Sequence, residues 1–266
     1  MHNMWLFQFN DIGHKSPLFH FNSQLCIKIQ FVVSKILIPD CRNCAVKGDS
    51  IFCTLTDKEW QKLNETKSSR AIKKGQVIFF ENDTVKGLHS IRTGKIKIYK
   101  TLDDGGMQIL RISKPGDIIG YRGLLGNGKY IGTAETLEDA EICFIPKQTI
   151  MELISSNLQF SLDLMSKFAS DLSEAEEKSI RFIQKSSKER LAEALLMLET
   201  SFGIDDNGFI QLNLTRHEIA AFAGLATETI IRCLRAWEEL GILDLDKKHI
   251  KILDKAQLIA ISNTPE

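Results

Sequence analysis

Short apolar runs separated by glycines dominate the chain from residue 71 to about residue 147. These runs include GQVIFF, GLHSI, GKIKIYK, MQILRI, GDIIG and AEICFIP. Alternating or β-rich runs at spacings of roughly ten residues, with glycine at the turns, are typical of an antiparallel β-roll or barrel. The alternation in GKIKIYK predicts that Ile96 and Ile98 point inward, while Lys95, Lys97 and Lys100 point outward.

The pattern changes to a helical period after the last of these runs. Neither proline nor glycine occurs between Thr149 and Gln184, and apolar residues recur every three or four positions, which predicts a long helix over residues 151–184. Such spacing is typical of a helix that packs along a partner, although an ordinary core-facing helix shows it too. The predicted dimerisation stripe consists of Leu158, Leu162, Met165, Ala169, Leu172 and Ile183. A second apolar edge, formed by Leu164, Phe168 and Ala175, can face the protein's own β-roll and so favours the dimer.

A helix-turn-helix pattern follows nearer the C-terminus. Thr215 and Glu218, three residues apart, form a capping box that begins a helix. The next three signals are a small residue where two helices touch, a glycine at the turn and an aliphatic residue that fixes the second helix. These signals are Ala220, Gly224 and Ile230.

The second helix of this motif extends from Thr227 to Glu239, and ILDLDKKHIKIL after it predicts the two short strands of a wing. Arginine can donate two hydrogen bonds to guanine, and glutamate can accept one from cytosine. Glu228 and Arg232 could therefore read neighbouring bases, although a salt bridge on a solvated helix face would use the same spacing. The predicted DNA contacts are Thr215, Arg216, Thr227, Glu228, Thr229, Ile231, Arg232, Lys247 and Lys248.

Composition limits this interpretation. The chain has 266 residues, of which 43% are hydrophobic and 26% charged, as expected of a soluble globular protein with two modest domains. Its 34 basic and 34 acidic residues cancel, which argues against a chain-wide basic surface for nucleic acid or membranes. Acids outnumber bases by 13 to 10 over residues 185–266. We therefore expect DNA binding of modest affinity that depends strongly on dimerisation.

The sequence gives no sign of a secreted protein, a membrane protein or an enzyme. The N-terminus lacks the basic region of a signal peptide, and the apolar stretch at residues 25–39 is interrupted by polar residues and too short to span a bilayer. There is no Walker loop, HExxH or GxSxG motif. We therefore expect a cytoplasmic protein that is not an enzyme and has no membrane partner.

A glycine-punctuated β-roll, a long helix and a C-terminal winged helix-turn-helix, in that order, resemble the Crp/Fnr family of bacterial transcription regulators. The stretches KKGQVIFFEND, SIRTGKIKIYK, KPGDIIGYRGLLG and LTRHEIAAFAGLATETIIRCL carry the resemblance. It implies an α+β fold: a cysteine-bearing loop and a cyclic-nucleotide-binding-type β-roll at 41–150, a dimerisation helix at 151–184 and a DNA-binding domain at 185–266. Residues 1–40 fall outside it, as an extra arm or an upstream misassigned start.

The resemblance also implies partners. Members of the family bind double-stranded DNA as homodimers on a palindrome, and contact with RNA polymerase is expected from the family. The stretch ETIIR looks like the family's base-contacting set, which implies that Glu228 and Arg232 read a TGA-like half-site core.

The cyclic-AMP-binding branch of the family holds the ribose with a Gly-Glu pair and the cyclic phosphate with an Arg-Ser/Thr-Ala triplet. The matching positions here are Gly120-Tyr121 and Gly132-Thr133-Ala134, so both charged residues are absent. A buried phosphate without its arginine would be left uncompensated, which argues against a cyclic nucleotide unless Arg122 substitutes. The predicted effector pocket consists of Gly120, Tyr121, Arg122, Gly132 and Thr133.

Three of the six cysteines lie within CRNCAVKGDSIFC at residues 41–53. The oxygen-sensing branch of the family binds a [4Fe-4S] cluster with N-terminal cysteines and one β-roll cysteine. The resemblance implies one such cluster per chain on Cys41, Cys44, Cys53 and Cys143. Zinc on the same thiolates and unligated thiols are the alternatives, and a haem on His89 or another ligand in the β-roll is a further one.

Overall fold

A computed structural model of the protein describes residues 40–48 and 50–263. Cys26 and the predicted N-terminal arm, apart from residue 40, lie outside the described residues. In the part that the structure describes, no helix combines the length and the apolar character needed to cross a membrane. All of the described residues belong to a single compact unit.

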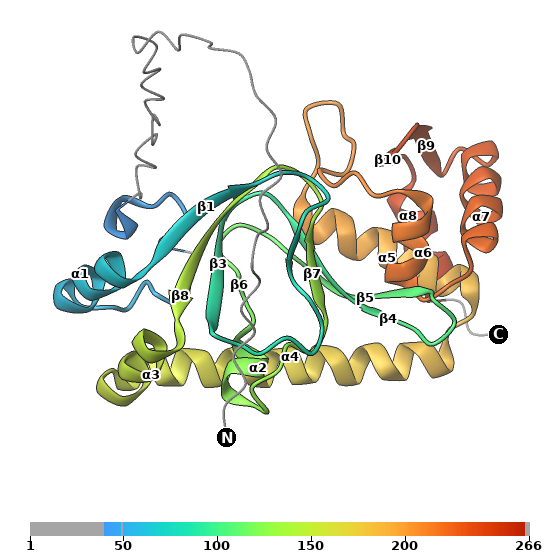
Figure 1. Cartoon of the computed structure of the whole chain (residues 1–266). Coiled ribbons are helices and arrows are strands. Elements are labelled where there is room, and N and C mark those ends of the chain that lie inside the picture. Colours follow the sequence, from blue (N-terminus) through green and yellow to red (C-terminus); the bar gives the residue numbers. More distant parts are fainter. Residues whose placement is uncertain (1–39, 49, 264–266) are drawn as a thin grey trace, which may run out of the picture. The chain divides into compact units, whose positions relative to one another are not determined.

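Two four-stranded antiparallel sheets form the β-roll (Figure 1). The strand order is β1-β8-β3-β6 in one sheet and β2-β7-β4-β5 in the other. Fully buried Leu88, Ile91, Ile96 and Ile142 belong to the core of this domain. The strands are β1 (Ser68–Ile72), β2 (Val77–Phe79), β3 (Gly87–Thr93), β4 (Ile96–Thr101), β5 (Met107–Ser113), β6 (Ile118–Ile119), β7 (Thr133–Thr136) and β8 (Ala140–Pro146). The predicted β-roll is confirmed, with β1 and β7 as strands that the glycine-spaced runs did not reveal.

Short helices cover parts of the β-roll. The 3-10 helix η1 (Cys41–Asn43) begins the described chain, α1 (Asp57–Thr66) follows it, and α2 (Tyr121–Leu125) connects β6 to β7. Helix α1 begins with a capping box between Thr56 and Glu59 and buries Trp60 and Leu63 against the core.

Residues 147–184 form two helices rather than one. Helix α3 (Lys147–Ser156) ends at Asn157, and α4 (Leu158–Gln184) begins directly after it. The Asn157 side chain accepts a hydrogen bond from the Phe160 backbone N–H at 2.9 Å, as expected of an N-cap, so α4 has its own start. Helix α4 runs alongside the β-roll (Figure 1), and Phe160, Leu164 and Phe168 pack into its core. The prediction of one helix over residues 151–184 is therefore wrong at its N-terminal end, because the long helix begins only at Leu158.

The C-terminal domain consists of three helices, a β-hairpin and a last helix. These are α5 (Ser187–Phe202), α6 (Arg216–Ala223), α7 (Thr227–Glu239), β9 (Leu243–Asp246), β10 (His249–Ile252) and α8 (Lys255–Ser262). Leu191, Leu195, Ile230 and Ile242 lie fully buried in its core. Leu137 from the β-roll belongs to the same core.

One lysine on the outer face of β4 is buried rather than exposed. Lys100 is exposed, but Lys97 is 6% exposed. Lys97 does point away from the interior of the β-roll, yet helix α6 covers it there. Lys97 therefore points outward as predicted but is buried there, because strand alternation identifies a face of the sheet but not what packs on it.

His89 on β3 is buried between two aromatic rings. It is 5% exposed, its ring lies 5.5 Å from that of Phe79 and 5.1 Å from that of Phe144, and its Nδ1 has no hydrogen-bond partner among the described residues. Burial, helped by the charge of Arg70, lowers the pKa of His89 from 6.5 to about 4. The imidazole is therefore neutral near pH 7.

We expect His89 to make the folded state less stable in acid. Because its pKa in the fold lies below that of the unfolded chain, its contribution is complete above about pH 6.5 and is lost as the pH falls towards 4, by about 3 kcal/mol in total. Urea unfolding from pH 7 to pH 4 measures this slope, which His89→Gln should reduce. His217→Gln, at an exposed position, is the matched control, and an unchanged slope in His89→Gln would contradict the assignment.

Candidate functional site

Helices α6 and α7 form the predicted helix-turn-helix. Thr215 and Glu218 close the capping box in both directions, and Gly224 ends α6 in the left-handed conformation with φ 66°. Ala220 is 2% exposed and Ile230 is fully buried. Each residue thus has the role that its position in the motif predicts.

The N-terminal half of α7 presents a polar face to solvent. Glu228 and Arg232 are exposed, Ile231 between them is half-buried, and all three line a shallow hollow together with Arg235. No ion pair joins Glu228 to Arg232 in the residues that the structure describes, so the alternative of a salt bridge is not what the structure contains. Both side chains are available to bases in a major groove.

The first turn of α6 and the wing are tied together. Arg216 Nη2 donates a hydrogen bond of 3.1 Å to the backbone oxygen of Lys247, whose φ of 53° makes the tight turn between β9 and β10. Thr215 Oγ1 lies 2.9 Å from the Glu218 carboxylate. Both side chains therefore hold the domain together internally, and their contact with DNA stays a prediction.

The predicted dimerisation stripe lies on the exposed side of α4. All six members are exposed, with Ile183 at 86%. Leu164, on the opposite edge, is 2% exposed against the β-roll. An apolar row left uncovered beside a buried one is the pattern expected of a helix that packs against a second copy.

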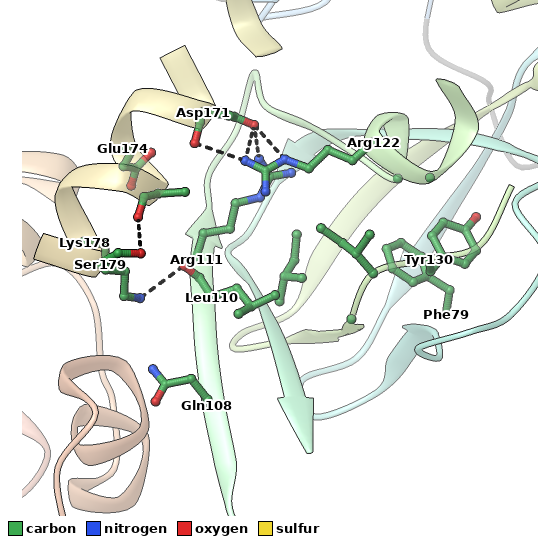
Figure 2. Close-up of a pocket in the computed structure, with 16 residues that line it drawn as sticks. Phe79, Gln108, Leu110, Arg111, Arg122, Tyr130, Asp171, Glu174, Lys178 and Ser179 are labelled. Atoms are coloured by element: carbon green, nitrogen blue, oxygen red, sulfur yellow. Dashed lines mark hydrogen bonds and ion pairs between the residues drawn. The ribbon is translucent and has the colours of Figure 1, made fainter. Parts of the chain in front are cut away.

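A cavity of about 390 Å³ lies between the β-roll and α4 (Figure 2). Of the residues predicted for the effector pocket, Gly120, Arg122 and Gly132 line this cavity, whereas Tyr121 and Thr133 do not. Tyr121 is fully buried and donates its hydroxyl hydrogen to Asp171. Thr133 accepts a hydrogen bond from the backbone of Glu81. The hydroxyl groups of Tyr121 and Thr133 therefore make hydrogen bonds to other residues of the protein rather than facing the cavity.

Asp171 of α4 brings three cations together at one end of the cavity, and Figure 2 shows two of them, Arg111 and Arg122, beside its carboxylate. Its carboxylate lies 3.1 Å from Arg111, 2.9 Å from Arg122 and 2.7 Å from Lys167, while 4% of its side chain is exposed. Arg122 is therefore already engaged by an internal carboxylate. It does not serve as an unpaired replacement for the missing phosphate-binding arginine.

Three of the four candidate cysteine ligands line one small pocket. Cys41, Cys44 and Cys143 belong to it, whereas Cys53 is exposed and does not. Lys67 Nζ donates a hydrogen bond of 2.6 Å to Cys41 Sγ, and Cys143 Sγ lies 3.1 Å from Ser69 Oγ. Burial raises the pKa of the Cys41 thiol, and the bond from Lys67 offsets this only in part.

The thiols as placed do not fit a four-thiolate cluster. Within residues 40–48 and 50–263, no three histidine, cysteine or acidic side chains converge closely enough to hold a metal ion. The same finding gives no support to zinc. We therefore assign no step to an iron-sulfur group.

Comparison with known proteins identifies both domains. A family model described as a cyclic nucleotide-binding domain matches residues 69–157, and one described as a Crp-like helix-turn-helix domain matches residues 189–261. The "Anaerobic regulatory protein" of Aggregatibacter actinomycetemcomitans is 30% identical over 229 residues, which cover 84% of this chain and 88% of that protein. The chain belongs to the Crp/Fnr family of transcription regulators.

Two further proteins resemble this chain over most of its length. The "Fumarate and nitrate reduction regulatory protein" of Vibrio cholerae is 29% identical over 227 residues, covering 84% of this chain and 90% of that one. The structure of FixK2 from Bradyrhizobium japonicum superposes with a TM-score of 0.67 at 24% identity, covering 76% of this chain and all of that one. The latter likeness concerns the fold alone.

Sequence reasoning missed several residues around the cavity of this Crp/Fnr regulator. Arg111 lines it from β5, and Asp171 and Lys178 line it from α4, which is far from the Gly120 and Gly132 segments in sequence. Asp171 could have been found from the sequence. The apolar pattern of α4 identifies the side of the helix that faces the β-roll, and Asp171 is an acidic residue on that side. Lys67 beside Cys41 had no comparable signal.

Proposed function

We propose that this Crp/Fnr regulator binds a palindromic DNA site as a homodimer and is controlled by an effector sensed in its N-terminal domain. The observation that carries the proposal is the combination of the exposed side chains of Glu228 and Arg232 on α7 with an exposed apolar stripe on α4. A two-fold dimer through α4 would place one recognition helix at each half-site. Regulation rather than catalysis agrees with the names of its relatives, and a DNA target supports a cytoplasmic location. Contact with RNA polymerase stays a prediction.

For the effector, the relatives favour a redox signal at the cysteine pocket. Two of them are named for anaerobic regulation and for fumarate and nitrate reduction. In this chain three thiols gather beside a buried lysine, next to η1 and α1. A change of thiol state there would alter the packing of the N-terminal segment on the β-roll.

The second candidate is a small ligand in the cavity between the β-roll and α4. Its size falls within the range of small-molecule sites, and Lys178 on its wall would suit an anionic group. A ligand there would touch α4 directly through the side that carries Asp171.

We expect DNA affinity of the wild-type protein, purified without oxygen, to change by about tenfold or more on exposure to air, within the usual range of allosteric coupling. Cys41→Ser should abolish this change, because it removes the thiol that Lys67 contacts. Arg122→Ala, at the cavity, should retain it. Fluorescence anisotropy with a duplex selected in vitro by the full-length protein measures the affinities.

Cys53→Ser is the matched control, because Cys53 is exposed and outside the pocket. An unchanged air response in this variant, without iron or sulfide in the protein, agrees with the arrangement described above. About four irons and four sulfides per chain, lost in both Cys53→Ser and Cys41→Ser, would instead establish a [4Fe-4S] cluster. A response that survives Cys41→Ser but not Arg122→Ala would move the effector to the cavity.

A further inference from the structure

The sensor domain contacts the helix-turn-helix through a buried lysine. Lys97 Nζ, on β4, lies 2.9 Å from Glu218 Oε1 at the start of α6 and 3.0 Å from Glu135 Oε1 on β7. The exposed fractions of the three side chains are 7% for Lys97, 14% for Glu218 and 21% for Glu135. An ion pair with so little water around it is screened much less than a surface pair.

Glu218 also has a structural role in the DNA-binding motif. Its Oε2 accepts a 2.8 Å hydrogen bond from the Thr215 backbone N–H, which closes the capping box. Burial opposes ionisation, yet the bonds from Lys97 and Thr215 together lower the pKa of Glu218. Burial would likewise lower the pKa of Lys97, but its bonds to Glu218 and Glu135 raise it. One carboxylate thus begins α6 and fixes it to β4.

Other contacts attach the same helix to the neighbouring strand. Gln108 Nε2, on β5, donates a 2.7 Å hydrogen bond to the backbone oxygen of Ala221 on α6. Ile112 of β5 and Leu137 after β7 pack into the core of the DNA-binding domain. Helix α6 is therefore docked on the edge of the β2-β7-β4-β5 sheet.

We propose that Lys97 is a positioning residue for DNA binding, which fixes the helix-turn-helix on the sensor domain through Glu218. The inference rests on the proposed dimeric function. Helix α7 is joined to α6 by the Gly224 turn, so the direction in which α6 is held sets the direction of the recognition helix. In a dimer joined by α4, the same contact in both protomers sets the distance between the two recognition helices.

A contact of this kind has a particular signature on DNA. Inserting one base pair at the centre of a palindrome rotates one half-site by about 35° and moves it by about 3.4 Å, from the helical repeat of about 10 base pairs. A protein with firmly docked recognition helices discriminates strongly against such a site. Loss of the contact should lower affinity for the correct spacing and reduce the discrimination.

The test compares full-length Lys97→Met with wild type on a duplex selected in vitro by the wild-type protein and on the same duplex with one added central base pair. We expect Lys97→Met to bind the selected duplex about tenfold more weakly and to lose most of its preference over the inserted one. Lys97→Arg should restore both values, because it keeps the charge.

Lys95→Met is the matched control. Lys95 lies two residues away and pairs with Glu138 at 3.0 Å within the β-roll, and among the described residues no side-chain hydrogen bond or ion pair joins it to α6, so its loss should leave spacing discrimination unchanged. Glu218→Gln keeps an acceptor for the capping box but removes the ion pair. Its effect and that of Lys97→Met should not add, since both remove one interaction.

The outcomes separate this inference from the function on which it rests. If the wild-type protein selects no palindrome, the proposed dimeric function fails. If it selects one, and a folded Lys97→Met protein keeps the wild-type affinity and spacing preference, the positioning role of Lys97 is overturned. Tighter binding by Lys97→Met would also overturn it, because the contact would then restrain rather than position the domain.

Discussion

Replacing Arg232 by alanine should weaken specific DNA binding by at least about 30-fold and relax the preference for one base pair in each half-site. A bidentate contact to guanine contributes about 1–3 kcal/mol to discrimination, and each of the two protomers of a dimer would lose it. Arg232 is exposed on the first turns of α7, and no ion pair to Glu228 holds it among the described residues. Its removal should therefore leave the fold intact.

Competition binding against every single-base variant of the selected site measures this effect. Lys248→Ala is the matched comparison, since Lys248 is an exposed cation at the wing turn. Lys248→Ala should weaken specific and non-specific DNA binding alike. It should also reduce the slope of log affinity against log salt concentration by about 1, as expected for the loss of one phosphate contact. If Arg232→Ala behaved like Lys248→Ala, Arg232 would be a backbone contact and not a reader of sequence.

Introducing glutamate at Leu172 should convert the protein to a monomer and lower DNA affinity by roughly 10²- to 10⁴-fold, the usual gain from linking two binding modules. Leu172 is 61% exposed in the single chain and lies in the middle of the stripe on α4. A second copy packed there would bury the new charge without a partner, at a cost that an interface of this kind does not offset.

Light scattering and sedimentation equilibrium of the full chain, at several concentrations, report the oligomeric state. Met151→Glu is the control, because Met151 is 42% exposed on α3 and outside the stripe. Dimerisation through another surface would be established if Leu172→Glu stayed dimeric, and the stripe would then need a different occupant.

Elements with strong local signals could be predicted from the sequence. The helix-turn-helix was found because each of its constraints is local: a capping box at Thr215, a left-handed glycine at 224 and a buried aliphatic at 230. Helix α1 carries the same kind of signal in Thr56 and Glu59 and was overlooked beside the cysteines. The break at Asn157 was missed because a single asparagine leaves the apolar period of a helix unchanged.

The candidate sites were harder to predict because they depend on which segments meet. Alternation places Lys97 on the outer face of β4 but does not show that α6 covers that face. Similarly, the spacing of Cys41, Cys44 and Cys53 suggests a shared site, whereas in the structure Cys53 lies outside the pocket that the other two line. Periodicity constrains one element at a time, and these sites combine several.

Leu137 and Ile112 belong to the β-roll in sequence, yet their side chains help to form the core of the DNA-binding domain. Consider a hybrid regulator in which a relative's C-terminal domain replaces the residues after 185. It would keep Leu137 and Ile112 but replace every residue of the DNA-binding domain that packs against them. The graft would succeed only where the incoming domain has a hollow that accepts Leu137. In this lineage, the halves of the protein are therefore expected to change together, and DNA specificity should be easier to alter within α7 than by exchanging domains.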